Sequence, residues 1–216
     1  MVNKGASLYE DLKKPQEAIA IFDEVIRRFG DATDPGIHEQ VAMAMTYKGM
    51  ALCEDLKKPQ EAIVVFDEVI RRFRDATDPG IQEQVAMAMT YKGVVLYEDL
   101  KKSQEAIELF DEVMRQFGKA TDPGIQEQVT MAMVYKGITL YEDLKKPQEA
   151  IAIFDEVIRR FGDATDPGIQ EQVAMAMAYK GVVLYNLKRY GEARKAFEQA
   201  AQRGDPDAKR ALEILW

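Results

Sequence analysis

Side chains that could carry out acid–base or nucleophilic chemistry are few in this chain of 216 residues, which has one histidine, His38, and one cysteine, Cys53. An enzyme needs a nucleophile, a base and a stabilising group in one asymmetric cluster. The segments around both residues recur along the chain, with glutamine in place of the histidine and tyrosine in place of the cysteine. We therefore predict a polar surface residue at His38, a packing or groove residue rather than a reactive thiol at Cys53, and no enzymatic activity.

Carboxylates are abundant, but their arrangement is typical of helix ends. Glu98 and Asp99 precede Lys101 and Lys102, and this pattern recurs along the chain. A single cysteine can form neither a disulfide within the chain nor a thiolate metal cage. Each Asp-Pro-Gly segment has one glycine beside an acidic residue, which would repel a phosphate group. The sequence therefore predicts no catalytic residue, no cofactor and no metal site.

Methionine and tyrosine recur at a constant interval and offer apolar contact rather than chemistry. Met43 and Tyr47 lie one helical turn apart, and equivalents follow every 44 residues. Methionine adapts to varied apolar shapes and therefore suits a binding groove, although the same stripe could be buried between two layers of helices. The candidate peptide-binding residues are Met43, Tyr47, Met50, Met87, Tyr91, Val94, Met131, Tyr135, Ile138, Met175, Tyr179 and Val182.

A lysine follows each of these tyrosines. The apolar stems of Lys48, Lys92, Lys136 and Lys180 are predicted to cover apolar surface while their ammonium groups stay in solvent. The alternative is that these ammonium groups contact an acidic group of a ligand.

The elements that would position these side chains belong to a repeat of 44 residues, which occupies 9–52, 53–96, 97–140 and 141–184 without a gap. The first and fourth copies differ at only four positions. A unit with one apolar helical face must pack on its neighbours to bury that face. We therefore predict a single array over residues 1–216, with a truncated first helix at 1–8 and a tail at 185–216.

The first half of each copy predicts a short amphipathic helix. In the first copy it covers residues 16–29, with proline in its first turn and apolar residues at helical spacing. Asp23 and Glu24 precede Arg27 and Arg28 by four residues, which is the favourable order for pairing on a solvent-exposed face.

The segment after this helix contains residues that end one helix and start the next. Gly30 is predicted to take a left-handed conformation, so that Arg74 at the same place in the second copy would give a different helix end. Thr33 or Asp34 could cap the following helix, which has Pro35 in its first turn.

The second half of each copy predicts a longer helix, at about residues 37–56 in the first copy. Gly49 lies in its interior, where glycine costs about 1 kcal/mol relative to alanine, which indicates a close approach of a neighbouring helix. The stripe predicted to face the interior consists of Ile37, Val41, Ala44, Met45 and Leu52.

The two ends of the chain depart from the repeat. Residues 3–5 occupy the place of 47–49, so the chain begins inside a helix and presents an uncapped apolar end that could associate with other molecules. The tail predicts one helix at 190–202 and another that starts at Asp205 and Pro206 and acts as a terminal cap. Trp216 is predicted to pack against the final helices.

Composition narrows the range of partners. The net charge is −8, so phosphate backbones and anionic membrane surfaces would be repelled, and we expect neither nucleic acid nor membrane as a partner. No run approaches 18 apolar residues, and the first residues do not resemble a signal peptide. We expect a cytoplasmic protein.

These residues resemble the tetratricopeptide repeat family. The four copies carry the same skeleton, with Gly49, Ala62 and Phe66 as examples, but their repeat is longer than the family's, which has about 34 residues. The spacing from glycine to the alanine of the next helix is also one residue longer in the copies than in the tail. The closest match lies in the tail, at Gly181, Leu184, Tyr185, Tyr190, Ala193, Phe197, Ala200 and Pro206.

The resemblance implies an all-α fold, a right-handed α-solenoid of antiparallel helix pairs in which the first helix of each pair lines a concave groove. It also implies a non-catalytic scaffold that binds a peptide or a helix of another protein along the candidate residues named above. The alternative is a structural module that associates end to end through its uncapped N-terminal repeat.

Overall fold

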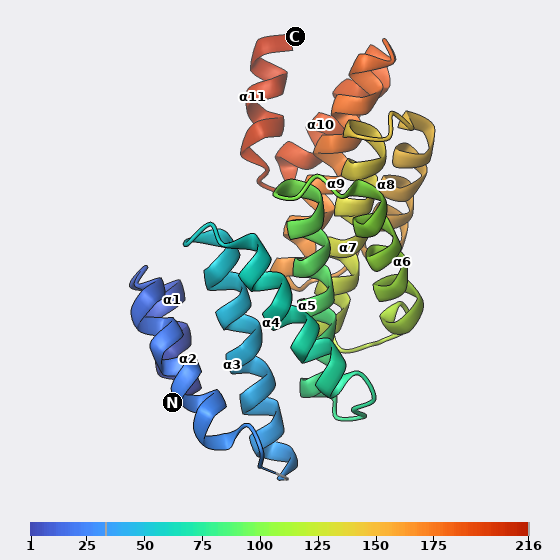
Figure 1. Ribbon diagram of the computed structural model, residues 1–216. Coiled ribbons are helices and arrows are strands. Elements are labelled where there is room, and N and C mark those ends of the chain that lie inside the picture. Colours follow the sequence, from blue (N-terminus) through green and yellow to red (C-terminus); the bar gives the residue numbers. More distant parts are fainter. Residues whose placement is uncertain (33, 216) are drawn as a thin grey trace. The chain divides into compact units, whose positions relative to one another are not determined.

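A computed structural model describes residues 1–32 and 34–215, so the predictions for Thr33 and Trp216 lie outside the described residues. Within these ranges the secondary structure is entirely helical and contains no strand (Figure 1). The all-α solenoid predicted from the sequence is confirmed. The helices of the described chain are α1 (Val2–Glu10), α2 (Pro15–Phe29), α3 (Pro35–Glu54), α4 (Pro59–Phe73), α5 (Pro79–Glu98), α6 (Ser103–Phe117), α7 (Pro123–Glu142), α8 (Pro147–Phe161), α9 (Pro167–Asn186), α10 (Tyr190–Gln202) and α11 (Pro206–Leu215).

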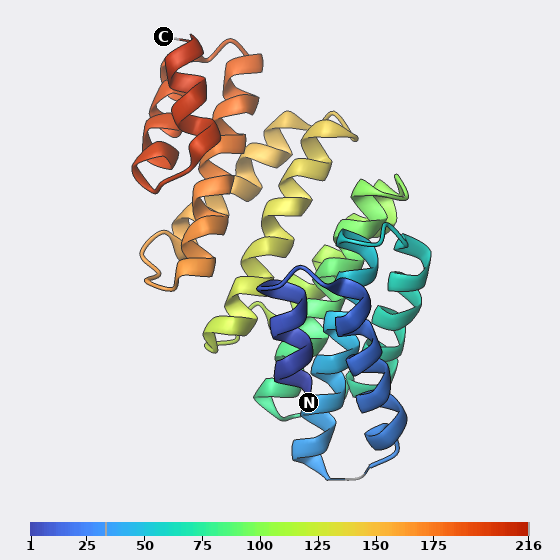
Figure 2. The same cartoon turned by 90° about the vertical axis from the view of Figure 1, so that its left-hand side faces the viewer.

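The helices group into two compact units, one from Met1 to Lys102 and one that begins at Ser103. In the first unit each helix packs against the next, and α3 also packs against α1 and α5. In the second unit the same pattern runs from α6 to α11, with α7 also packed on α9. The last helix, α11, lies beside α10 (Figure 2).

The long helices start at an aspartate followed by proline. The side chain of Asp34 accepts hydrogen bonds from the backbone N–H groups of Gly36 and Ile37. Asp78, Asp122 and Asp166 cap α5, α7 and α9 in the same way. Each accepts a hydrogen bond from the backbone N–H of the isoleucine three residues later. Each cap satisfies backbone donors that have no partner inside the helix.

The prediction for the ends of the short helices was wrong. Gly30 has φ −57° and is right-handed, and Arg74 has φ −49°. Both residues donate their backbone N–H to the residue four positions earlier, so arginine and glycine give the same helix end. A right-handed conformation needs no glycine.

The left-handed residue is instead the first lysine of each Lys-Lys pair, with φ between 51° at Lys13 and 56° at Lys101. In the tail it is Lys188, which precedes an arginine and has φ 61°. The backbone N–H of Lys58 reaches back six residues to the carbonyl of Leu52, at 2.8 Å. In the tail the bond from Arg189 to Leu184 spans five residues. The additional residue in the four copies is accommodated in this turn.

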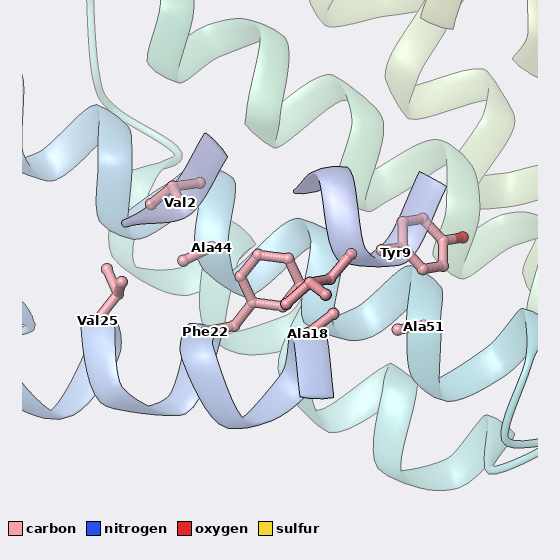
Figure 3. Close-up of a cluster of buried hydrophobic side chains, with 8 residues drawn as sticks. Val2, Tyr9, Ala18, Phe22, Val25, Ala44 and Ala51 are labelled. Atoms are coloured by element: carbon pink, nitrogen blue, oxygen red, sulfur yellow. The ribbon is translucent and has the colours of Figure 1, made fainter. Parts of the chain in front are cut away.

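The core of each helix pair contains a phenylalanine of the short helix. Phe22, Phe66, Phe110 and Phe154 are completely buried. Figure 3 shows Phe22 among Val2, Ala18 and Ala44. The predicted interior stripe is confirmed at Val41, Ala44, Met45 and Leu52, which are buried, whereas Ile37 is half-buried.

The mid-helix glycines make room for these rings. A Cβ atom on Gly137 would lie 2.5 Å from Cε1 of Phe154, and one on Gly181 would lie 2.8 Å from Cε1 of Phe197. Gly49 faces Phe66 in the same way. The close approach predicted from the sequence is therefore present at these three positions.

Candidate peptide-binding groove

The candidate groove residues lie on the long helices of both units, on α3 and α5 in the first and on α7 and α9 in the second. The prediction had left open whether this stripe is exposed or buried, and most of its members are half-buried. Val182 is the most accessible, at 38% exposed, whereas Ile138 is 3% exposed and cannot present a surface to a ligand. The half-buried members are Met43, Tyr47, Met50, Met87, Tyr91, Val94, Met131, Tyr135, Met175 and Tyr179.

Each tyrosine ring packs on the core phenylalanine of the short helix before it. The ring centroids of Tyr47 and Phe22 are 6.0 Å apart, and those of Tyr179 and Phe154 are 6.4 Å apart. Burial, and a hydrogen bond from its hydroxyl to Glu10, raise the pKa of Tyr47 to about 12. The first tyrosine of the ladder is thus fixed at both ends and would offer a ligand its ring rather than its hydroxyl.

The ammonium groups of these lysines each pair with an aspartate at the partly exposed interface of two helices, a contact that the sequence had not revealed. Lys48 pairs with Asp23 across the α2–α3 interface, with 2.5 Å between Nζ and Oδ1. Lys92–Asp67, Lys136–Asp111 and Lys180–Asp155 have the same distance. The aspartate therefore bridges two helices instead of pairing along its own, while Glu24 pairs with Arg27 and Arg28 as an exposed surface group.

His38 has a structural contact that the sequence did not reveal. Its Nε2 lies 2.5 Å from the carbonyl oxygen of Ala32, and its ring meets Phe73 edge-on. Gln82 donates to the carbonyl oxygen of Ala76 at the equivalent place. Histidine therefore takes the place of glutamine as a half-buried side chain that binds the loop before the long helix. This contact gives His38 a structural role and does not indicate a catalytic base.

Cys53 is buried, which agrees with the packing role that we predicted for it. Burial raises the pKa of its thiol to about 12, so the thiolate needed for nucleophilic reaction does not form at neutral pH. The thiol borders a hollow of about 170 Å³ that is also lined by Tyr91, Val94 and Glu98. Tyrosine stands at this position in the other copies.

Cys53→Tyr should therefore stabilise the chain. The new ring would fill the hollow, and its hydroxyl could donate to Glu98 as Tyr9 donates to Glu54. We expect the free energy of unfolding in urea to rise by about 1–2 kcal/mol. Cys53→Ser is the matched control, because it removes the thiol without filling the space, and it should lower stability. A destabilising tyrosine would show that the hollow cannot accept the ring.

Three candidate residues come together at a concavity in the second unit. Met175, Tyr179 and Val182 of α9 line a cavity of about 420 Å³. Phe197 of α10 contributes to its lining, and Ala208 and Ala211 of α11 form the opposite wall.

Acidic side chains complete this cavity. Glu142, Asp205 and Asp207 line it, and no basic residue does. Asp205 also caps α11 by accepting a hydrogen bond from the backbone N–H of Ala208, at 2.7 Å. An adjoining hollow of about 580 Å³ shares Met175, Asp205 and Asp207. The sequence predicted that the terminal helix is a cap. It could not predict that a cavity remains between this helix and α9.

Other kinds of site receive no support from the part of the chain that the structure describes. Histidine, cysteine and carboxylate side chains form no cluster of metal-binding geometry there. Among the described helices, none has the length and apolar content needed to span a bilayer.

Comparison with known families agrees with this geometry. Two sequence models of the tetratricopeptide repeat match, one over residues 135–209 and one over residues 1–32. Residues 1–32 and 135–209 therefore resemble tetratricopeptide repeats, and the chain as a whole is similar to proteins of that family. The first match includes α9, α10 and the start of α11, which surround the cavity. Repeats of this family generally mediate protein–protein interaction or scaffolding.

A solved structure of a tetratricopeptide-repeat protein has a similar fold. A thermophilic tetratricopeptide-repeat protein of Thermus thermophilus superimposes with a TM-score of 0.57 at 15% identity, covering 99% of this chain and 95% of that one. An engineered protein reaches a TM-score of 0.48 at 13% identity, covering 98% of this chain and 95% of that one. Among proteins of curated function, none matches the sequence.

Proposed function

We propose that the chain is a non-catalytic scaffold that binds a peptide or helix of another protein on the apolar, tyrosine-lined surface of its long helices. The family's general role supports a protein ligand. The observation that carries the proposal is the convergence of Met175, Tyr179 and Val182 on one cavity. Its volume is in the range of sites that hold an apolar ligand group. Half-buried residues of α3 and α5 would offer a similar surface in the first unit.

The chemistry of the cavity favours a particular ligand. Apolar walls favour an aliphatic or aromatic side chain, and the acidic rim favours lysine or arginine beside it. The net charge of −8 would also increase the rate of encounter with basic segments. We therefore propose a ligand segment in which apolar residues are flanked by basic ones.

Loss of the apolar wall should weaken this binding. Peptides selected against the full chain from a random displayed library should be rich in apolar residues flanked by lysine or arginine. Tyr179→Ala and Val182→Asp should each weaken their binding by about tenfold or more in fluorescence anisotropy.

Val64→Asp is a matched control, because Val64 is 68% exposed on α4 and lies outside the candidate set. It should leave the affinity unchanged, and circular dichroism should show that all three variants remain helical. The proposal would be contradicted if selection enriched no sequence, or if both variants on α9 bound the selected peptides as tightly as the parent chain does.

A second function, association through the N-terminal end, is favoured by a separate observation. Phe29 of α2 is 38% exposed and Met1 is 58% exposed, which is unusual for large apolar residues at one place. Ile214 on the terminal helix is 68% exposed. An apolar end of this kind would support end-to-end contact between chains. Sedimentation over a range of concentrations should then show larger species that Phe29→Asp removes.

A further inference from the structure

The first position of each repeat is a tyrosine, except in the second copy, where it is Cys53. The tyrosine rings at this position are packed, with Tyr9 6% exposed and Tyr97 7% exposed. In the second copy a hollow of about 170 Å³ borders the cysteine. The thiol donates to the carbonyl oxygen of Met50, on its own helix, at 3.3 Å, and leaves the hollow open.

The first copy shows what a tyrosine ring contacts at this position. The ring of Tyr9 meets Tyr47 edge-on, with 6.1 Å between centroids, and its hydroxyl donates to Glu54. The residues at the same two positions one repeat later are Tyr91 and Glu98. Both of them line the hollow. The hollow therefore has the aromatic wall and the hydrogen-bond acceptor of a tyrosine ring, but no ring occupies it.

The size of the hollow suits a single aromatic ring. A cavity of about 150 Å³ in a protein core can hold benzene, and this hollow has about 170 Å³. Val94 and Val95 of α5 add apolar contact to that of the Tyr91 ring. Lys57 and Asp99 also line the hollow and are exposed, so a small ligand can enter from solvent.

The charges around the hollow favour a cation. Three carboxylates line it, those of Glu54, Glu98 and Asp99, against the single ammonium group of Lys57. A positive charge on the ligand would therefore be attracted, and a negative charge would be repelled. A carboxylate has lone pairs for several hydrogen bonds, so Glu98 can accept one from a ligand in addition to its contacts within the chain.

We propose that this hollow binds a small phenolic amine. The phenol ring would lie against Tyr91, its hydroxyl would donate to Glu98, and its ammonium group would lie among the exposed carboxylates. The lining accounts for one ring, one hydroxyl and one cation, which is the whole of such a molecule. The hollow belongs to the first unit, so the inference does not rest on the cavity beside α9.

The tyrosines of a second copy of the chain are a poor source of the ring. Tyr190 is exposed at 48%, but its ring packs edge-on against Tyr185, with 5.1 Å between centroids. Tyr9 and Tyr97 are buried, so they could be donated only by partial unfolding. A free phenolic amine carries neither cost.

The test titrates the full chain with tyramine, a phenol with a short ammonium tail, by isothermal titration calorimetry at neutral pH and low ionic strength. We expect saturable binding with a Kd below about 1 mM. Phenethylamine, which lacks the hydroxyl, should bind about fivefold more weakly. In para-hydroxyphenylacetate a carboxylate replaces the ammonium group, and this ligand should bind about threefold more weakly or worse.

Three variants locate the ligand. Cys53→Tyr should abolish binding, because its side chain would occupy the hollow as Tyr9 occupies the equivalent place. Cys53→Ser is the matched control, since it removes the thiol but keeps the hollow, and it should bind tyramine within about twofold of the parent chain. Glu98→Ala should remove most of the difference in affinity between tyramine and phenethylamine. Circular dichroism should show that all three variants remain helical.

The inference would be overturned if tyramine showed no saturable binding, or if Cys53→Tyr bound it as tightly as the parent chain does. Equal affinities for tyramine, phenethylamine and para-hydroxyphenylacetate would show that neither the hydroxyl nor the charge is recognised, and would also overturn it. The capped tripeptide Lys-Tyr-Lys tests the other source of a phenol ring. If it binds no more tightly than tyramine, the small ligand is supported. If it binds about tenfold more tightly or better, the ligand is a tyrosine of a protein and the proposal is wrong.

Discussion

Phe154→Ala is expected to lower the free energy of unfolding by about 3–5 kcal/mol. The ring is completely buried, lies against Gly137 and packs on Tyr179 with 6.4 Å between centroids. Truncation would leave a cavity at the junction of three helices, which closely packed neighbours can only partly fill. Urea denaturation followed by circular dichroism measures the loss.

The control for this prediction is Leu12→Ala, because Leu12 is 59% exposed. Its effect should stay within about 0.5 kcal/mol. In a repeat protein each unit depends on its neighbours, so hydrogen exchange should also increase in α7 and α9 of the Phe154 variant. Equal effects of the two substitutions would contradict the packing described above.

For Gly137→Ala, helix propensity and core packing should change the stability in opposite directions. Helix propensity alone would favour alanine by about 1 kcal/mol at this mid-helix position. The new Cβ would lie 2.5 Å from Cε1 and 2.8 Å from Cζ of Phe154, so the buried ring would have to move. Overpacking of this kind typically costs about 1–3 kcal/mol. We expect net destabilisation, measured as a lower thermal midpoint.

Gly191→Ala in α10 is the matched control. A Cβ at Gly191 would meet nothing within 4 Å, so only the propensity gain of up to about 1 kcal/mol applies. The two alanines should therefore shift the thermal midpoint in opposite directions. A stabilising Gly137→Ala would show that the glycine is not there to admit the ring.

The helices could be predicted because their signals are local. Apolar residues at the helical period located α2 and α10 to within a residue, and in α2 the proline of the first turn added a second signal. Gly49 and its equivalents could be interpreted because an unfavourable residue that recurs inside a helix needs a reason, and close packing is the usual one. Aspartate before proline indicated the start of α3, but the predicted range of about 37–56 lay two residues beyond the observed Pro35–Glu54.

Other features depend on contacts between distant residues. Asp23 had a suitable arginine on its own helix, yet it pairs with Lys48 on the next one, because the packed helices bring the two groups together. The left-handed conformation that we had assigned to Gly30 is instead taken by Lys13, in the turn between α1 and α2. Neither outcome follows from residue type alone.

The sequence predicted the candidate site only as a stripe of residues along the long helices. Periodicity placed Ile138 and Val182 in equivalent positions, but the first is buried and the second is exposed, since different neighbours cover them. The cavity also needs the terminal cap α11, whose Ala208 and Ala211 line it. Small side chains there leave space that larger ones would fill. This space could be recognised only once the packing of the helices was known.

The most direct test of the proposed scaffold is methyl NMR of the full chain labelled at its methionines, titrated with a selected peptide. Met175 lines the cavity, whereas Met177, two residues further along α9, is buried in the core and serves as an internal reference. We predict that the Met175 methyl signal shifts and saturates with the peptide while the Met177 signal moves little. Saturable binding that leaves Met175 unchanged would contradict the proposal that this surface is the binding site.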